Sequence, residues 1–132
     1  MKYFTIEELC RSTTAEHKGI DNRCSKEVAV NLTALVDNVL DPLRTWYGKP
    51  ITVNSGYRCP VLNKAVGGAA TSQHMSGQAA DITTGDRGQN KLLFEYIHKS
   101  LPFDQLIDES DFAWVHVSYR ADGKNRKQVL KL

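Results

Sequence analysis

Residues 72–81 read Ser72-Gln73-His74-Met75-Ser76-Gly77-Gln78-Ala79-Ala80-Asp81, and residues 114–118 read Trp114-Val115-His116-Val117-Ser118. Together the two segments offer two imidazoles, from His74 and His116, and one carboxylate, from Asp81. Two imidazole nitrogens and one carboxylate oxygen are a ligand set of catalytic zinc ions, in which a fourth position stays open for water. A zinc ion bound by these residues would indicate a hydrolase.

Short strands are predicted around these ligands, at residues 79–83 and 114–119. Successive side chains of a strand point to opposite faces, so Trp114, His116 and Ser118 share one face and the intervening valines share the other. Ala79 and Asp81 likewise share a face, while a loop delivers His74. The three ligands can therefore converge without a steric conflict.

Helical patterns precede these strands. A short amphipathic helix is predicted at residues 3–10, with Thr5 as its N-cap, and a polar loop at residues 11–24. Apolar residues then recur at helical spacing from Val28 to Trp46, with Ser25 as the cap and Gly48 as the end. Pro42 is expected to kink or split this helix, with Asp41 capping the second piece.

Shorter elements fill the rest of the chain. We predict a strand at 51–53, a turn at 54–56, and helices at 60–66 and 90–99. Two antiparallel strands are predicted at 105–107 and 114–119, joined by a polar turn at 108–112. An edge strand is predicted at 127–130. Helices come mostly first and strands mostly later. This order predicts an α+β fold, with a small antiparallel sheet packed against helices, in one domain over residues 1–132.

Composition excludes several classes of protein. The hydrophobic share of 41% and the charged share of 24% are ordinary for a soluble globular protein. A net charge of +2 without a Lys/Arg block does not predict nucleic acid binding. No apolar run is long enough to insert into a membrane. The three cysteines are an odd number without a C-x-x-C pair, so no disulfide framework is expected. Nothing in the sequence specifies an oligomeric state.

The patterns S-x-H-x-x-G-x-A-x-D and W-x-H-x-S, with Ser55-Gly56-Tyr57-Arg58 upstream, resemble a known family. It is the zinc D-alanyl-D-alanine carboxypeptidase and L-alanyl-D-glutamate endopeptidase family, peptidoglycan peptidases with a hedgehog-like fold. The resemblance runs from Tyr3 through the C-terminal strand. Five fixed residues in a ten-residue window arise by chance at roughly one start position in a million, so an accidental match is excluded.

This resemblance implies a role for each matching residue. His74, Asp81 and His116 would be the ligands of one Zn²⁺ ion. Arg58 would bind and polarise the scissile carbonyl or bind a substrate carboxylate. From their places beside the ligands, Ser72 and Ser118 are predicted to orient the ligands and contact substrate, and Trp114 to form a wall of the cleft.

The general base is harder to assign. Many relatives carry an acidic residue three positions before the last histidine. Here that position is Ala113. Relatives of the shorter type carry a Gln-Leu-Ile-x-Glu segment, which residues 105–109 match. We therefore predict Glu109 as the base, with Asp111 and then Asp108 as alternatives.

The function that the resemblance implies is hydrolysis of a bond involving a D-amino acid in peptidoglycan stem peptides, of carboxypeptidase or endopeptidase type. Glu7 and Glu8 interrupt any signal-peptide core. We therefore expect synthesis in the cytoplasm and action on the cell wall after release, as in a phage or prophage lysis enzyme. One alternative, favoured by Ala113, is a catalytically silent peptidoglycan-peptide or metal-binding module. Another is a metal-free interaction domain, which would keep the three ligands far apart.

Overall fold

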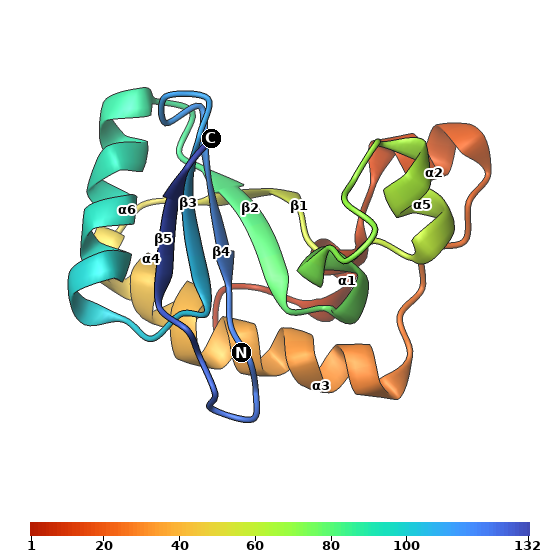
Figure 1. Ribbon diagram of the computed structural model, residues 1–132, viewed down its shortest axis with the longest axis horizontal. Helices are drawn as coiled ribbons and strands as arrows, with labels where there is room; N and C mark the ends of the chain where they lie inside the picture. Colours follow the sequence, from red (N-terminus) through yellow and green to blue (C-terminus); the bar gives the residue numbers. More distant parts are fainter.

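A five-stranded sheet lies at the centre of the computed structural model, which describes residues 1–132 (Figure 1). Its strands are β1 (Thr52–Ser55), β2 (Ala79–Thr83), β3 (Gln105–Glu109), β4 (Trp114–Ser118) and β5 (Gln128–Lys131). They are arranged in the order β1-β2-β4-β3-β5. All neighbours are antiparallel except β5, which runs parallel to β3. The predicted α+β class is confirmed, and the parallel fifth strand makes the sheet mixed.

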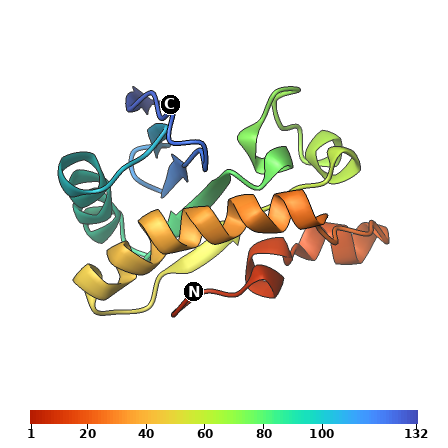
Figure 2. The same cartoon turned by 90° about the horizontal axis from the view of Figure 1, so that it is seen from below.

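Helices cover one face of this sheet and one of its ends. They are α1 (Ile6–Cys10), α2 (Thr13–Lys18), α3 (Lys26–Leu35), the π-helical turn η1 (Val36–Leu40), α4 (Asp41–Tyr47), α5 (Pro60–Ala65), the 3₁₀ turn η2 (Gln73–Ser76) and α6 (Arg87–Ser100). The continuous run α3–η1–α4 passes beneath the sheet, with α6 beside it (Figure 2). Helices α1, α2 and α5 gather near β1 (Figure 1).

The hydrophobic core lies between the sheet and the run α3–η1–α4 with α6. Ala80 and Ile82 of β2, Leu106 of β3, and Val115 and Val117 of β4 are fully buried there. Because side chains alternate along a strand, the residues between them point to the opposite face. That second face therefore carries the polar and histidine side chains of the same strands.

The long helical run begins as predicted but passes through Pro42 differently. Ser25 caps it, since its Oγ accepts the Val28 N–H at 3.2 Å. The proline neither splits nor ends the helix, because a π-helical turn precedes it and the Asp41 N–H donates to the Val36 carbonyl. The prediction that Asp41 caps a second piece is wrong. Its carboxylate instead accepts backbone N–H groups of residues 2 and 3.

Two further segments differ from the predictions. Residues 13–18 form helix α2 instead of a loop, because the Ser12 hydroxyl accepts the Ala15 N–H and Gly19 ends the helix in the left-handed region. The predicted turn at 54–56 is wrong in part, since Asn54 and Ser55 belong to β1. A register shift after Val53 lets the strand continue to Ser55.

The connection between β3 and β4 is shorter than predicted and is held by α6. Residues 110, 111 and 112 all have positive φ angles. The Arg87 guanidinium donates to the carbonyls of Ser110 and Asp111, and the Asn90 amide donates to the carbonyl of Phe112. Asp108 and Glu109, which were expected in the turn, therefore lie at the end of β3.

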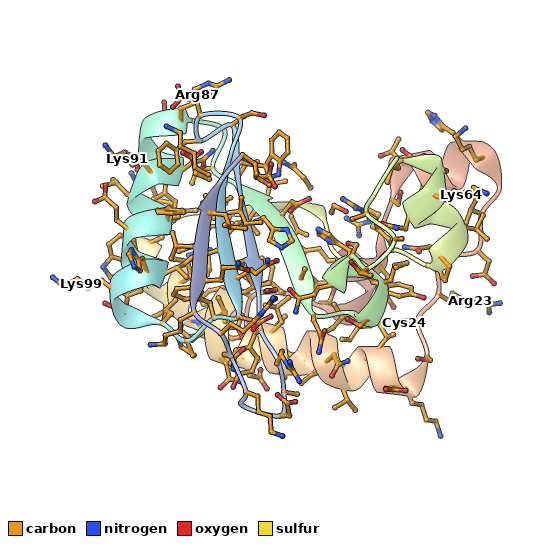
Figure 3. All side chains as sticks on the ribbon, viewed as in Figure 1. Arg23, Cys24, Lys64, Arg87, Lys91 and Lys99 are labelled. Atoms are coloured by element: carbon orange, nitrogen blue, oxygen red, sulfur yellow. The ribbon has the colours of Figure 1, made fainter.

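The surface of α6 is charged on the side that faces away from the sheet. Lys91 and Lys99 project outward from it (Figure 3), while Leu93 and Ile97 are fully buried on the other side. This is the expected division of an amphipathic helix. None of the helices has both the length and the apolar character that crossing a membrane requires.

The three cysteines are free thiols in the structure. Cys10 lies in α1, and Cys24 lies just before α3. Burial, and then the contact with Cys24, raises the pKa of the Cys10 thiol to about 12. Cys10 is therefore protonated at neutral pH, where the thiol is a poor nucleophile.

Gly77 fixes the approach of η2 to α3, and its replacement by alanine is expected to destabilise the fold. Its φ is 76°, and an added Cβ would lie 2.8 Å from both Val28 Cγ1 and the Val28 carbonyl oxygen. Gly48 has nearly the same φ but no atom within 4 Å of such a Cβ. Urea unfolding should show a loss of about 3 kcal/mol for Gly77→Ala and about 1 kcal/mol for Gly48→Ala. Equal losses would mean that the contact with α3 is unimportant.

Candidate metal centre and active-site cleft

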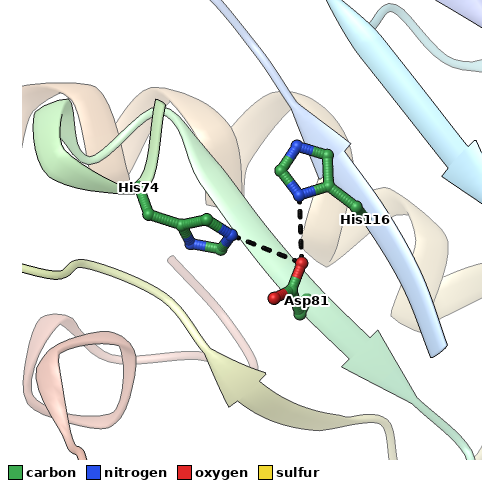
Figure 4. A group of neighbouring side chains, drawn as sticks. All are labelled: His74, Asp81 and His116. Carbon is green, nitrogen blue, oxygen red and sulfur yellow. Dashed lines mark hydrogen bonds and ion pairs between the residues drawn. The ribbon is translucent and has the colours of Figure 1, made fainter. Parts of the chain in front are cut away.

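The three predicted ligands meet on the open face of the sheet (Figure 4). Asp81 lies at the centre of β2, directly opposite His116 of β4, and His74 reaches over from η2. The Nε2 of His74 lies 3.3 Å from Asp81 Oδ1, and the Nδ1 of His116 lies 3.0 Å from the same oxygen. All three side chains are buried or nearly so. This arrangement contradicts the alternative in which the three residues are far apart.

His74 is oriented by the chain segment before α5. Its Nδ1 lies 2.6 Å from the carbonyl oxygen of Gly56, so Nδ1 carries the proton and donates it there. The other ring nitrogen, Nε2, faces Asp81. Gly56 itself cannot be replaced easily, because a Cβ would lie 2.2 Å from the Leu9 carbonyl oxygen. The backbone packing of α1 thus helps to set the direction of the imidazole.

The donor set fits a single metal ion. Ligand atoms about 2.1 Å from a tetrahedral ion lie roughly 3.4 Å from one another, close to the separations of 3.0 and 3.3 Å found around Asp81 Oδ1. The three residues are the one group of histidine, cysteine and acidic side chains in the molecule whose donor atoms lie within 4.8 Å of one another. His74, Asp81 and His116 are thus able to hold one ion together.

Asp81 supplies the negative charge of this centre. Burial opposes its ionisation, but hydrogen bonds with His116 and His74 outweigh that effect and hold the pKa of Asp81 below its usual range. The carboxylate is therefore anionic at neutral pH, as a metal ligand must be.

Arg58 lies beside Asp81, on the loop between β1 and α5. Its Nε donates to Ser55 Oγ at 3.0 Å and its Nη1 to Asn63 Oδ1 at 3.4 Å. Its Nη2 lies 3.5 Å from Asp81 Oδ2. The Arg58 side chain is only 16% exposed, so these contacts hold the guanidinium in a fixed position.

A cleft of about 490 Å³ opens over the three ligands. Its walls come from four of the five strands and from the segment around η2. The lining residues are Arg58, Ala69, Thr71, Ser72, Gln73, His74, Asp81, Gln105, Ile107, Glu109, Trp114, His116, Arg126, Leu130 and Leu132. The cleft therefore offers room for a peptide next to the candidate metal centre.

Only one of the three candidate bases lines this cleft. Side chains alternate along β3, so Glu109 shares the cleft face with Gln105 and Ile107. Asp108 points the other way, is buried, and accepts the Phe112 N–H. Asp111 lies in the exposed turn. Glu109 is the carboxyl group that is placed to reach a molecule bound over the ligands.

The environment of Glu109 favours its protonated form more than water would. Burial raises the pKa of Glu109, the negative charges of Asp81 and Asp108 raise it further, and His116 and His74 oppose these effects. A carboxyl group with a raised pKa is a better match to proton transfer near neutral pH.

The other predicted contacts divide into two groups. Ser72 and Trp114 line the cleft, and the Ser72 hydroxyl accepts the backbone N–H of His74 at 3.2 Å, which supports η2. Ser118 does not reach the cleft. It is fully buried, and its hydroxyl accepts the Gln105 N–H at 2.9 Å. The prediction that Ser118 contacts substrate is therefore wrong, because the hydroxyl is used between two strands.

Gln73 and Arg126 also line the cleft, and neither is among the predicted site residues. Gln73 precedes His74 inside the first motif, which was the available signal. Arg126 lies just before β5, and it contacts Asp104, just before β3. Because β3 and β5 are parallel neighbours, the residues that precede them meet at the same edge of the sheet.

The comparisons with known proteins agree with this geometry. A family model described as Peptidase M15 matches residues 2–118. Over 40 residues, the chain is 55% identical to the zinc D-Ala-D-Ala carboxypeptidase of Streptomyces albus G. That match covers 30% of this chain and 16% of the relative, so it spans a small part of that protein.

Proposed function

We propose that this chain, which belongs to the peptidase M15 family, is a zinc metallopeptidase that hydrolyses a bond involving a D-amino acid in peptidoglycan stem peptides. The observation that carries the proposal is the approach of His74 Nε2 and His116 Nδ1 to one oxygen of Asp81. The cleft above these atoms supports a peptide substrate.

The chain's own residues divide the chemistry among themselves. Zinc held by His74, Asp81 and His116 would supply an acidified water and polarise the scissile amide. Glu109 accepts a proton from the attacking water and delivers it to the leaving amine. Arg58 places fixed positive charge where the carbonyl oxygen becomes negative. Ser72 holds the turn that carries His74.

Digestion of defined muropeptides tests the substrate class. The zinc-loaded protein should produce a new amine and a new carboxylate at one defined bond, as detected by mass spectrometry. Bond position in a pentapeptide and in a tetrapeptide separates a carboxypeptidase from an endopeptidase. The same peptides with L-alanine in place of D-alanine, and with L-glutamate in place of D-glutamate, are the matched controls. Equal cleavage of the L-peptides would contradict the proposed specificity.

Metal removal is expected to abolish this hydrolysis, since the water loses its activating ion. Treatment with a chelator should lower the rate by at least about 1,000-fold, and added Zn²⁺ should restore it. Elemental analysis should find close to one zinc ion per active chain. Full activity in a metal-free sample would reject a zinc peptidase.

A catalytically silent peptide- or metal-binding module is the second candidate, because Ala113 occupies the position where many relatives carry an acidic residue. The place of Glu109 in the cleft supports catalysis instead. Zinc-loaded protein that binds muropeptides without cleaving any bond would favour the silent module.

For the cellular setting, we propose action on the cell wall after release from the cytoplasm, as in a phage or prophage lysis enzyme. The net charge of +2 is compatible with contact with an anionic wall polymer. Purified protein added to outer-membrane-permeabilised bacteria should lower their turbidity. Release of soluble peptide from isolated walls without any effect on whole cells would favour a housekeeping role in wall turnover.

A further inference from the structure

An ion pair between buried Asp104 and half-exposed Arg126 lies at the β3–β5 edge of the sheet, and Arg126 lines the cleft there. Asp104 is fully buried, and Arg126 binds it through Nε at 3.0 Å and Nη2 at 2.8 Å. The backbone N–H of Arg126 and the Nε2 of Gln73 donate to the same carboxylate, at 2.8 and 2.9 Å. Four donors thus satisfy both Asp104 oxygens, and they hold the guanidinium plane of Arg126 in one orientation.

Arg126 retains hydrogen-bonding capacity that Asp104 does not use. Its side chain is 53% exposed and lines the cleft. Nε and one N–H of Nη2 serve Asp104, so the other guanidinium N–H groups are free. Arg58 differs, because all three of its guanidinium nitrogens already contact protein atoms. Of the two cleft arginines, Arg126 is the more exposed and keeps more N–H groups free for a second anion.

Gln73 connects this ion pair to the candidate metal centre. It precedes His74 in η2, and its amide nitrogen is anchored on Asp104. Its amide oxygen is the one buried side-chain polar atom without a hydrogen-bond partner in the molecule. Unpaired buried acceptors are uncommon in folded proteins, so the Gln73 amide oxygen is an unusual feature of this wall. Arg126 therefore offers free donor groups in the wall that Gln73 connects to the ligands.

We propose that Arg126 binds a carboxylate of the peptide substrate, and that Asp104 and Gln73 position it for this role. The inference rests on the proposed function, and it names the residue that recognises a negative charge of the substrate in the same cleft. A fixed guanidinium with free N–H groups matches a carboxylate by paired hydrogen bonds. Stem peptides offer this chemistry at two places, the C-terminal carboxylate and the free carboxylate of D-glutamate. Arg58 then remains available for the scissile carbonyl.

Paired substrates test the proposal. One stem peptide is prepared with both carboxylates free, and in two forms that carry a carboxamide at one place each. The zinc-loaded protein should cleave one amidated form about tenfold less efficiently in kcat/KM, as expected for one lost charged hydrogen-bonded contact. Arg126→Gln should raise KM for the free peptide about tenfold with kcat little changed, and it should remove the discrimination. Arg126→Lys should retain part of it.

Arg120→Gln is the matched control. Arg120 pairs with Asp122 on the surface and does not line the cleft, so its loss should leave the carboxylate-to-amide ratio unchanged. Arg126→Gln also leaves buried Asp104 without its cation, and the resulting loss of stability lowers the rates of all peptides by one common factor. An altered ratio therefore reports recognition, and a thermal melt reports stability.

The outcomes separate this inference from the proposed function. The same carboxylate-to-amide ratio in the wild type, Arg126→Gln and Arg120→Gln would overturn the role of Arg126. Failure of the wild type to cleave any of the peptides would reject the proposed function. In that event, calorimetric binding of the same three peptides to the same proteins still measures the ratio, and it decides the role of Arg126.

Discussion

Replacement of His116 by alanine is expected to lower hydrolysis by at least about 1,000-fold and to reduce the zinc content from about one ion per chain to far below one. The imidazole lies 3.0 Å from Asp81 and supplies one of three protein ligands. Loss of an outer-shell partner of a ligand already costs about 10–100-fold in metal affinity, so loss of a ligand must cost more. Elemental analysis and the muropeptide assay, both at limiting zinc, measure the two effects.

His17→Ala is the control for this experiment, because His17 is exposed on α2. Its removal should change neither zinc content nor rate. Far-UV circular dichroism should show the same fold for both variants, since His116 faces the cleft and not the hydrophobic core. Retention of a full zinc ion by His116→Ala would place the metal elsewhere.

The second large effect is expected for Glu109→Gln, which should lower kcat by about 100- to 10,000-fold, the range in which general acid–base catalysis contributes. The glutamine keeps the size of the side chain but cannot accept the proton. Zinc content should stay at about one ion per chain, because Glu109 is not a member of the ligand group. Loss of rate with retention of metal would therefore identify a proton-transfer role.

Two neighbouring carboxylates provide matched controls for Glu109. Asp111→Asn should leave the rate within about twofold, since the side chain lies in the exposed turn away from the cleft. Asp108→Asn should act on stability, because this buried carboxylate accepts the Phe112 N–H. An inactive Asp111→Asn beside an active Glu109→Gln would move the base to the turn.

Local chemistry accounts for most of what could be predicted from the sequence. Ser25 caps its helix because its hydroxyl accepts a backbone N–H that the first helical turn leaves unpaired. The face alternation of β2 and β4 correctly placed Asp81 and His116 on the open side of the sheet. The family resemblance was carried by the short motifs, and the match of the family model to residues 2–118 confirms it.

Contacts between residues far apart in the sequence account for most of the features that could not be predicted. Asp41 was read as a cap, but its partners are backbone groups at the start of the chain, which no local pattern reveals. Asp104 and Arg126 were missed because their contact requires the parallel alignment of β3 and β5. The prediction for Ser118 is wrong because its hydroxyl accepts the backbone N–H of Gln105. The pairing of β4 with β3 is needed to predict this contact. Helix α2 is different, since its signals at Ser12 and Gly19 are local in the sequence.

Because Asp81 lies directly opposite His116, metal binding depends on the correct register between β2 and β4. A slip of one residue between β2 and β4 would turn every side chain of the moved strand to the other face, so that a ligand would enter the core and a valine would face the cleft. Only the correct alignment can take up the ion. Binding at a concentration of 100 times Kd stabilises that alignment by about 2.7 kcal/mol relative to chains that cannot bind. Misaligned molecules would therefore be both less stable and inactive, and zinc supply would govern the yield of correctly assembled enzyme as well as its rate.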